Sequence, residues 1–158
     1  MKIINSQSAA ITHILVAFKK NVQQAALKCL LSNGFIGVAS SETAPGSFEE
    51  LQAFYKNAKR FTGLALFPVY SGGNDNSIYD CVATNKLARA WHDLGHILLN
   101  APFTLEGEKI VAEWQCAQLH GIDKEIMYCD VVAQVEYYIN KGEFVANQKQ
   151  FVTSRVFA

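Results

Sequence analysis

The sequence has no excess of either charge, and this absence excludes several classes of protein. Its 158 residues include 14 basic and 14 acidic side chains, so the formal net charge is zero. No basic surplus is present for nonspecific binding to nucleic acid. No block of like charge suggests an interaction tail either. We therefore expect no strong nucleic-acid partner.

Other absences bear on membranes and on the cell compartment. No run of 18 apolar residues occurs, so no membrane-spanning helix is predicted. The N-terminal stretch has neither the basic region nor the small-residue cleavage site of a signal peptide. The four cysteines are never spaced as Cys-x-x-Cys, which disfavours a cysteine zinc site and suits reduced core thiols. We expect a cytoplasmic protein without a membrane partner.

What the sequence does have is apolar residues at helical spacing. Hydrophobic residues make up 50% of the chain, enough for a domain of this length to bury a core. Ser47, Thr104 and Asp123 are the expected N-caps of three helices. The predicted helices cover approximately residues 6–31, 47–60, 77–99, 104–119, 123–140 and 145–156.

Two short segments in the N-terminal half have strand character. Phe35–Ala39 and Leu64–Tyr70 are apolar, and Pro68 confines the second to an edge or a loop. Residues 71–76, Ser-Gly-Gly-Asn-Asp-Asn, form the clearest turn signal. We predict a mainly α fold, with residues 1–158 as a single-domain helical bundle that has room for a small β element in its N-terminal half.

The segment 85–100, NKLARAWHDLGHILLN, carries the strongest functional signal. His92 and His96 are four residues apart and share one helix face, so both imidazoles can bind one divalent metal ion. Asn85 and Arg89 lie on the same stripe, between apolar neighbours. A polar stripe on an otherwise apolar helix predicts a buried site.

Two later helices carry residues that could complete such a site. Glu108 stands in the first turn of one, and Asp130, Gln134 and Tyr137 share a face of the next at i, i+4 and i+7. If the helices pack side by side, the histidines meet Glu108 or Asp130. Nitrogen and carboxylate ligands suit zinc, manganese or iron, and helical bundles often build metal sites in this way.

Structural interpretations of the same residues remain open at this point. Two histidines four apart occur by chance on many helices, and they can be core side chains with satisfied hydrogen bonds. Glu108 and the nearby Glu106 favour the dipole at a helix N-terminus. Arg89 can clamp a phosphate or carboxylate, or it can pair with Asp93 or Glu108.

Two local resemblances point to hydrolases. AWHDLGHIL resembles the zincin helix, His-Glu-x-x-His, with Asp93 where that family has its general base. HDLGHILLNAPFTLEGE is similar to HD-domain phosphohydrolases. That resemblance implies that His92 and Asp93 bind metal together with a later Asp130, although no earlier histidine has the usual spacing of that family.

A longer resemblance runs from Asn85 to Tyr137. The order Asn…Arg-Ala-x-His-Asp…His…Gly-Glu…Gln resembles a group of phage-encoded domains. This resemblance implies a viral origin, a location in the host-cell cytoplasm and one shared polar site, without a defined reaction.

These patterns predict a metal-dependent hydrolase. The expected ligands are His92 and His96, with Glu108 or Asp130 as a third. Asp93 orients a ligand or acts as a base, Arg89 holds an anionic substrate, and Asn85, Gln134 and Tyr137 are further polar residues of the site.

The predicted substrate is a small molecule, and a phosphoester is slightly favoured because Arg89 shares the histidine stripe. One alternative is a zincin-like peptidase with Asp93 in place of the catalytic glutamate. Another is a non-enzymatic phage protein that binds and modulates a host protein, in which case the polar stripes are buried hydrogen-bond networks.

Overall fold

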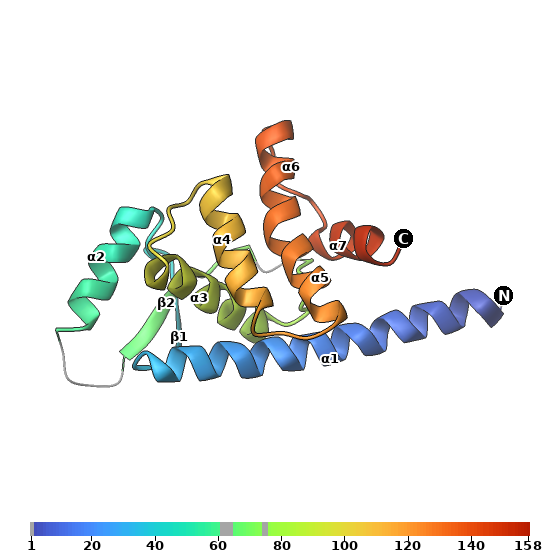
Figure 1. Ribbon diagram of the computed structural model, residues 1–158, viewed down its shortest axis with the longest axis horizontal. Helices are drawn as coiled ribbons and strands as arrows, with labels where there is room; N and C mark the ends of the chain where they lie inside the picture. Colours follow the sequence, from blue (N-terminus) through green and yellow to red (C-terminus); the bar gives the residue numbers. More distant parts are fainter. Residues whose placement is uncertain (1, 61–64, 74–75) are drawn as a thin grey trace.

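The computed structural model describes residues 2–60, 65–73 and 76–158. It confirms a mainly α-helical protein with a small β element (Figure 1). Among the described residues, no helix is both long and apolar enough to cross a membrane. The elements in chain order are α1 (Lys2–Ser32), β1 (Phe35–Ser41), α2 (Phe48–Ala58), β2 (Ala65–Tyr70), α3 (Val82–Leu98), α4 (Leu105–Cys116), α5 (Ile122–Tyr128), the π-helical segment η1 (Cys129–Ala133), α6 (Gln134–Lys141) and α7 (Gln148–Val156).

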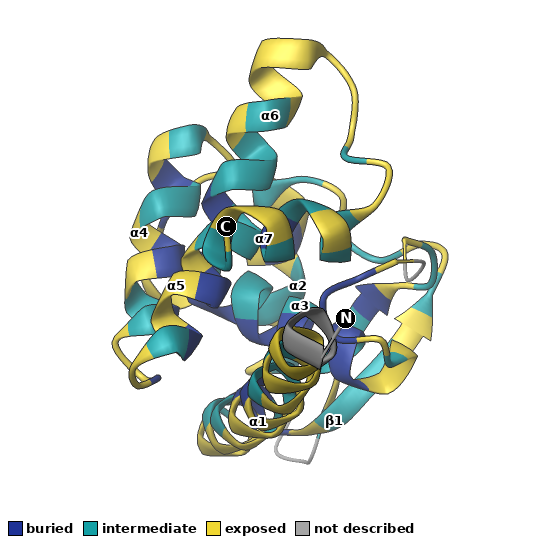
Figure 2. Cartoon of the chain, turned by 90° about the vertical axis from the view of Figure 1, so that its right-hand side faces the viewer, coloured by how far each residue is buried: buried dark blue, intermediate teal, exposed yellow. Residues whose placement is uncertain are grey.

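The long helix α1 runs along one side of the protein, and the other helices all lie on the same side of it (Figure 1). Its apolar residues recur every four positions, so Phe18, Val22 and Ala26 all face the main core. There they meet Trp91 of α3 and Ile126 of α5, which are fully buried. Residues 6–10 of α1 extend beyond this core and are exposed (Figures 1 and 2).

The β element is a parallel pair of strands, β1 and β2, joined through α2. Phe35 and Phe67 bring it into a second core cluster with Leu51 of α2 and Leu94 of α3. Pro68 pairs opposite Ala39. In a two-stranded sheet each strand has an open edge, so the missing amide hydrogen of proline is tolerated there. Leu64 and part of the predicted turn lie outside the described residues.

Two expected helix starts are wrong. Helix α3 begins at Val82 rather than near residue 77, because Asp80 has a positive φ of 50° that no helix accommodates. Helix α5 is capped by Gly121, with φ 57° and ψ −133°, and not by Asp123. Asp123 instead lies in the first turn, where its carboxylate accepts a hydrogen bond from Asn21 of α1 at 2.7 Å.

Two other predicted caps are confirmed. The Ser47 hydroxyl accepts from the amide of Glu50 at 3.1 Å, and the Thr104 hydroxyl accepts from the amide of Gly107 at 3.1 Å. The predicted helix over 123–140 is continuous from α5 to α6, but it passes through the wider π-helical turn η1 in its middle.

Candidate metal centre

Two glycines allow α3 and α4 to approach closely. A Cβ on Gly95 would lie 2.8 Å from the Trp114 ring and 2.9 Å from Val111, both on α4. A Cβ on Gly107 would overlap the carbonyl oxygen of Pro102. The start of α4 therefore packs tightly against the segment that follows α3, and this packing places Glu108 over the histidine face.

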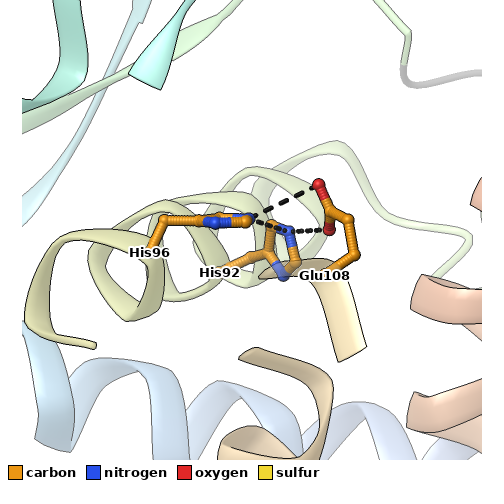
Figure 3. A group of neighbouring side chains, drawn as sticks. All are labelled: His92, His96 and Glu108. Atoms are coloured by element: carbon orange, nitrogen blue, oxygen red, sulfur yellow. Dashed lines mark hydrogen bonds and ion pairs between the residues drawn. The ribbon is translucent and has the colours of Figure 1, made fainter. Parts of the chain in front are cut away.

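Three side chains converge at this contact: His92 and His96 of α3, and Glu108 of α4 (Figure 3). One ligand atom from each lies within 4.8 Å of the others. His92 Nε2 is 2.8 Å from Glu108 Oε2, and His96 Nε2 is 3.5 Å from Glu108 Oε1. The two Nε2 atoms are 3.0 Å apart. The structure thus brings the two histidines together with Glu108, as expected, and this group could hold a metal ion.

The outer hydrogen bonds of the histidines orient both rings. His96 Nδ1 is 2.7 Å from the carbonyl oxygen of Ala101, which can only accept, so Nδ1 carries the hydrogen. His92 Nδ1 is 3.1 Å from Oε1 of Gln115, which accepts in the same way. In their neutral forms both rings therefore direct an Nε2 lone pair at Glu108. Metal-binding histidines are usually anchored in this way.

Glu108 favours the protonated form of His92 within this group. Burial alone would lower the pKa of His92, but the hydrogen bond and the charge of Glu108 outweigh it and raise the pKa to about 9. Burial would raise the pKa of Glu108, but its hydrogen bonds to both histidines lower it to about 2. The two Nε2 atoms and the Glu108 carboxylate therefore stabilise a positive charge placed between them. A bound divalent cation would supply such a charge.

The three side chains of the triad differ in how far they are buried. The side chain of His96 is fully buried, whereas His92 is 20% and Glu108 15% exposed. Phe103 covers His96, with ring centroids 4.7 Å apart. His92 and Glu108 line a cavity of about 510 Å³, so the triad is closed on the His96 side and open towards this cavity.

The two other predicted acidic residues line the same cavity. Asp93 and Asp130 do not belong to the converging triad, and Asp130 as a metal ligand stays a prediction. Burial raises the pKa of Asp93 to about 6 and that of Asp130 to about 7, despite nearby positive charge. Both carboxyl groups therefore change charge near neutral pH, as acid–base residues of active sites do.

Arg89 also lines the cavity, but its guanidinium group serves the loop after β2. Its Nη1 donates to the carbonyl oxygens of Gly72 at 2.6 Å and Tyr70 at 3.2 Å, and its Nη2 donates to Gly73 at 2.6 Å. Asn85 donates to the same Gly73 carbonyl at 3.4 Å. These two predicted site residues fix one wall of the cavity, and a substrate contact by Arg89 stays a prediction.

Gln134 and Tyr137 are separated by the structure. Gln134 lines the cavity and donates to Asp130 at 2.7 Å. Tyr137 is not among the lining residues and packs edge-on against Phe151 of α7, with centroids 5.6 Å apart. Tyr138 lines the cavity instead. The π-helical turn η1 has more residues per turn than an α-helix, so the face that follows it is shifted from the expected α-helical register.

Sequence reasoning missed the anchors of the two histidines. Gln115 is fully buried and lies seven residues after Glu108, on the same face of α4. A glutamine seven residues after a candidate ligand, among apolar residues of the same helix, was a usable signal. The Ala101 carbonyl gave no signal, because a backbone acceptor can be supplied by any residue.

Comparisons with family models, curated proteins and solved structures found no match for this chain. Functional inference therefore depends on the site itself.

Proposed function

We propose that this protein is a hydrolase that uses one divalent metal ion bound by His92, His96 and Glu108. The observation that carries the proposal is the convergence of two anchored Nε2 atoms and one carboxylate beside an open cavity. Two histidines and one carboxylate form the ligand set of catalytic zinc sites and of non-haem iron sites with open positions. Zinc, manganese and iron are the candidate ions.

The residues around the triad suit hydrolysis. A divalent ion held by His92, His96 and Glu108 would supply Lewis acidity for hydrolysis. Asp93 follows His92 directly and lines the cavity, and above a pH of about 6 it is ionised and can accept a proton. Gln115 is fully buried behind the triad and orients the His92 ring, and His96 is the fully buried member of the triad.

For the substrate we propose a phosphoester of a small molecule. The cavity of about 510 Å³ has the size of a small-molecule site. The resemblance to HD-domain phosphohydrolases supports this class. The resemblance to phage-encoded domains implies no reaction, and it would place the protein in the cytoplasm of an infected host cell.

A zincin-like peptidase is the second candidate, and one observation favours it. The third member of the triad comes from the helix that follows the His-x-x-x-His helix, which gives the two-histidine, one-glutamate set of thermolysin-type sites. Asp93 then takes the position of the zincin base. Its side chain is one methylene shorter, so Asp93→Glu should raise peptide cleavage and should not raise phosphoester cleavage.

Metal binding tests the proposal directly. Protein stripped with a chelator should bind about one zinc or manganese ion per chain, measured by calorimetry and elemental analysis. His96→Ala and Glu108→Gln should abolish or strongly weaken binding. His120→Ala is the matched control, since His120 is exposed and lies outside the triad.

Hydrolysis then tests the class of reaction. Generic phosphoester and peptide substrates should be compared with the metal-loaded protein, with Asp93→Asn and with Glu108→Gln. Metal-dependent cleavage that both variants lose supports the proposal. A correctly folded protein that binds no metal after saturation and desalting would overturn it and would leave the host-protein-binding alternative.

A further inference from the structure

Two stacked aromatic side chains line the cavity in addition to His92 and Glu108 of the triad. Tyr138 of α6 and Phe144, in the loop before α7, both line it. Their rings are stacked, with centroids 4.5 Å apart and planes 21° from parallel. Tyr138 is 44% and Phe144 79% exposed, so neither ring is used to build the core. Exposed stacked rings that line a cavity are suited to bind a flat group.

A polar pair lies in the same cavity. Asp130 accepts a hydrogen bond from Gln134 at 2.7 Å, and both side chains are among the lining residues. They belong to the same helical run as Tyr138, one turn and two turns before it. A carboxylate accepts hydrogen bonds from an amino group, and a glutamine amide both donates and accepts. The pair can therefore read the edge of a flat heterocycle that stacks on the aromatic rings.

The hydrogen bonds of Arg89 indicate how a charged ligand would be oriented in the cavity. The Nη atoms of Arg89 are directed to the carbonyl oxygens of Tyr70, Gly72 and Gly73. A phosphate is therefore better held at the triad, and the uncharged part of the ligand then lies toward Asp130 and Tyr138. A cavity of about 510 Å³ is large enough for a ligand of nucleotide size.

We propose that the cavity binds a free nucleotide whose base carries an exocyclic amino group. The base stacks on the Tyr138–Phe144 pair, its amino edge meets Asp130 and Gln134, and its phosphate lies at the triad of His92, His96 and Glu108. This inference rests on the proposed hydrolase function and names its substrate class. A free nucleotide is favoured over a nucleic-acid strand because the chain has no basic surplus to hold a phosphate backbone.

Nucleosides test the base-binding residues without the metal. Chelator-treated protein should bind adenosine or cytidine at least tenfold more tightly than inosine or uridine, which present a carbonyl where the amino group would be. Phe144→Ala and Tyr138→Ala should each weaken adenosine binding roughly 5-fold or more, in line with the usual strength of base stacking. Tyr128→Ala is the matched control, because Tyr128 is also exposed but does not line the cavity.

Asp130→Asn tests the edge contact. The amide should reduce the preference for amino bases, because asparagine can also donate to a carbonyl. Equal binding of all four nucleosides, or no nucleoside binding at millimolar concentration, would overturn the inference even if one metal ion binds per chain. Nucleoside binding without metal binding would instead overturn the hydrolase proposal. Tighter binding of a short adenine oligonucleotide than of adenosine monophosphate would overturn the assignment to a free nucleotide.

Discussion

Asp130→Asn is expected to stabilise the metal-free protein at pH 8. Burial raises the pKa of Asp130 from 3.8 to about 7, so the folded state resists ionisation of this carboxyl group. The free-energy cost is absent below the unfolded pKa, grows as the pH rises and is complete above the folded pKa. At about 1.4 kcal/mol for each unit of pKa difference, the upper bound is ~4 kcal/mol. Because Asp130 keeps partial solvent exposure, we expect about half of this, ~2 kcal/mol, at pH 8.

Urea unfolding of the chelator-treated protein measures this effect. Asparagine keeps the size of the side chain and an oxygen that can accept from Gln134, so packing is preserved. At pH 5 the gain should fall to about 1 kcal/mol or less, because the folded wild type is then protonated at this position. Glu125→Gln, an exposed carboxylate on α5, should change the stability by less than about 0.5 kcal/mol at either pH. An Asp130→Asn protein that is less stable than wild type at pH 8, or equally shifted at both pH values, would refute this account.

Three further predictions concern the triad and its supports. Because the pKa of His92 is about 9, metal affinity should rise with pH between 6 and 9 and binding at pH 7 should release about one proton, which calorimetry in buffers of different ionisation enthalpy measures. Gly107→Ala should lower the stability by ~2 kcal/mol or more through its overlap with Pro102, while Gly46→Ala should not; equal melting temperatures would contradict the packing argument. Gln115→Met should keep the fold and weaken metal binding about 10- to 100-fold by releasing the His92 ring, and an unchanged affinity would show that this anchor is unimportant.

The convergence of the triad was largely predictable from the sequence because its geometry is local. The spacing of His92 and His96 fixes a common face as soon as the helix is assigned. The Thr104 cap fixes where α4 begins, and therefore which face Glu108 occupies. Long-range information was needed only to know that α3 and α4 lie side by side.

The rest of the cavity depended on features that periodicity does not report. Because of the π-helical turn η1, Tyr138 lines the cavity in place of the expected Tyr137. A helix with 3.6 residues per turn throughout does not predict that shift. The use of Arg89 depended on the path of the loop after β2, which only the folded chain defines. The start of α3 depended on the positive φ of Asp80, and the sequence around Asp80 does not mark this backbone conformation.

The residues of the candidate metal centre lie close together in the sequence, and this helps in finding related sites. The three side chains of the triad and the two groups that anchor its histidines all lie within residues 92–115, on α3, α4 and the loop between them. The unit reduces to the spacing His-x3-His-x11-Glu-x6-Gln, with a glycine immediately before the second histidine and another before the glutamate. This helix–loop–helix unit can be inherited or grafted as a module, independently of the long helix and the strand pair that surround it here. It can also be searched for by its spacing. The same spacing in an unrelated chain would predict the same convergence of two imidazoles and a carboxylate.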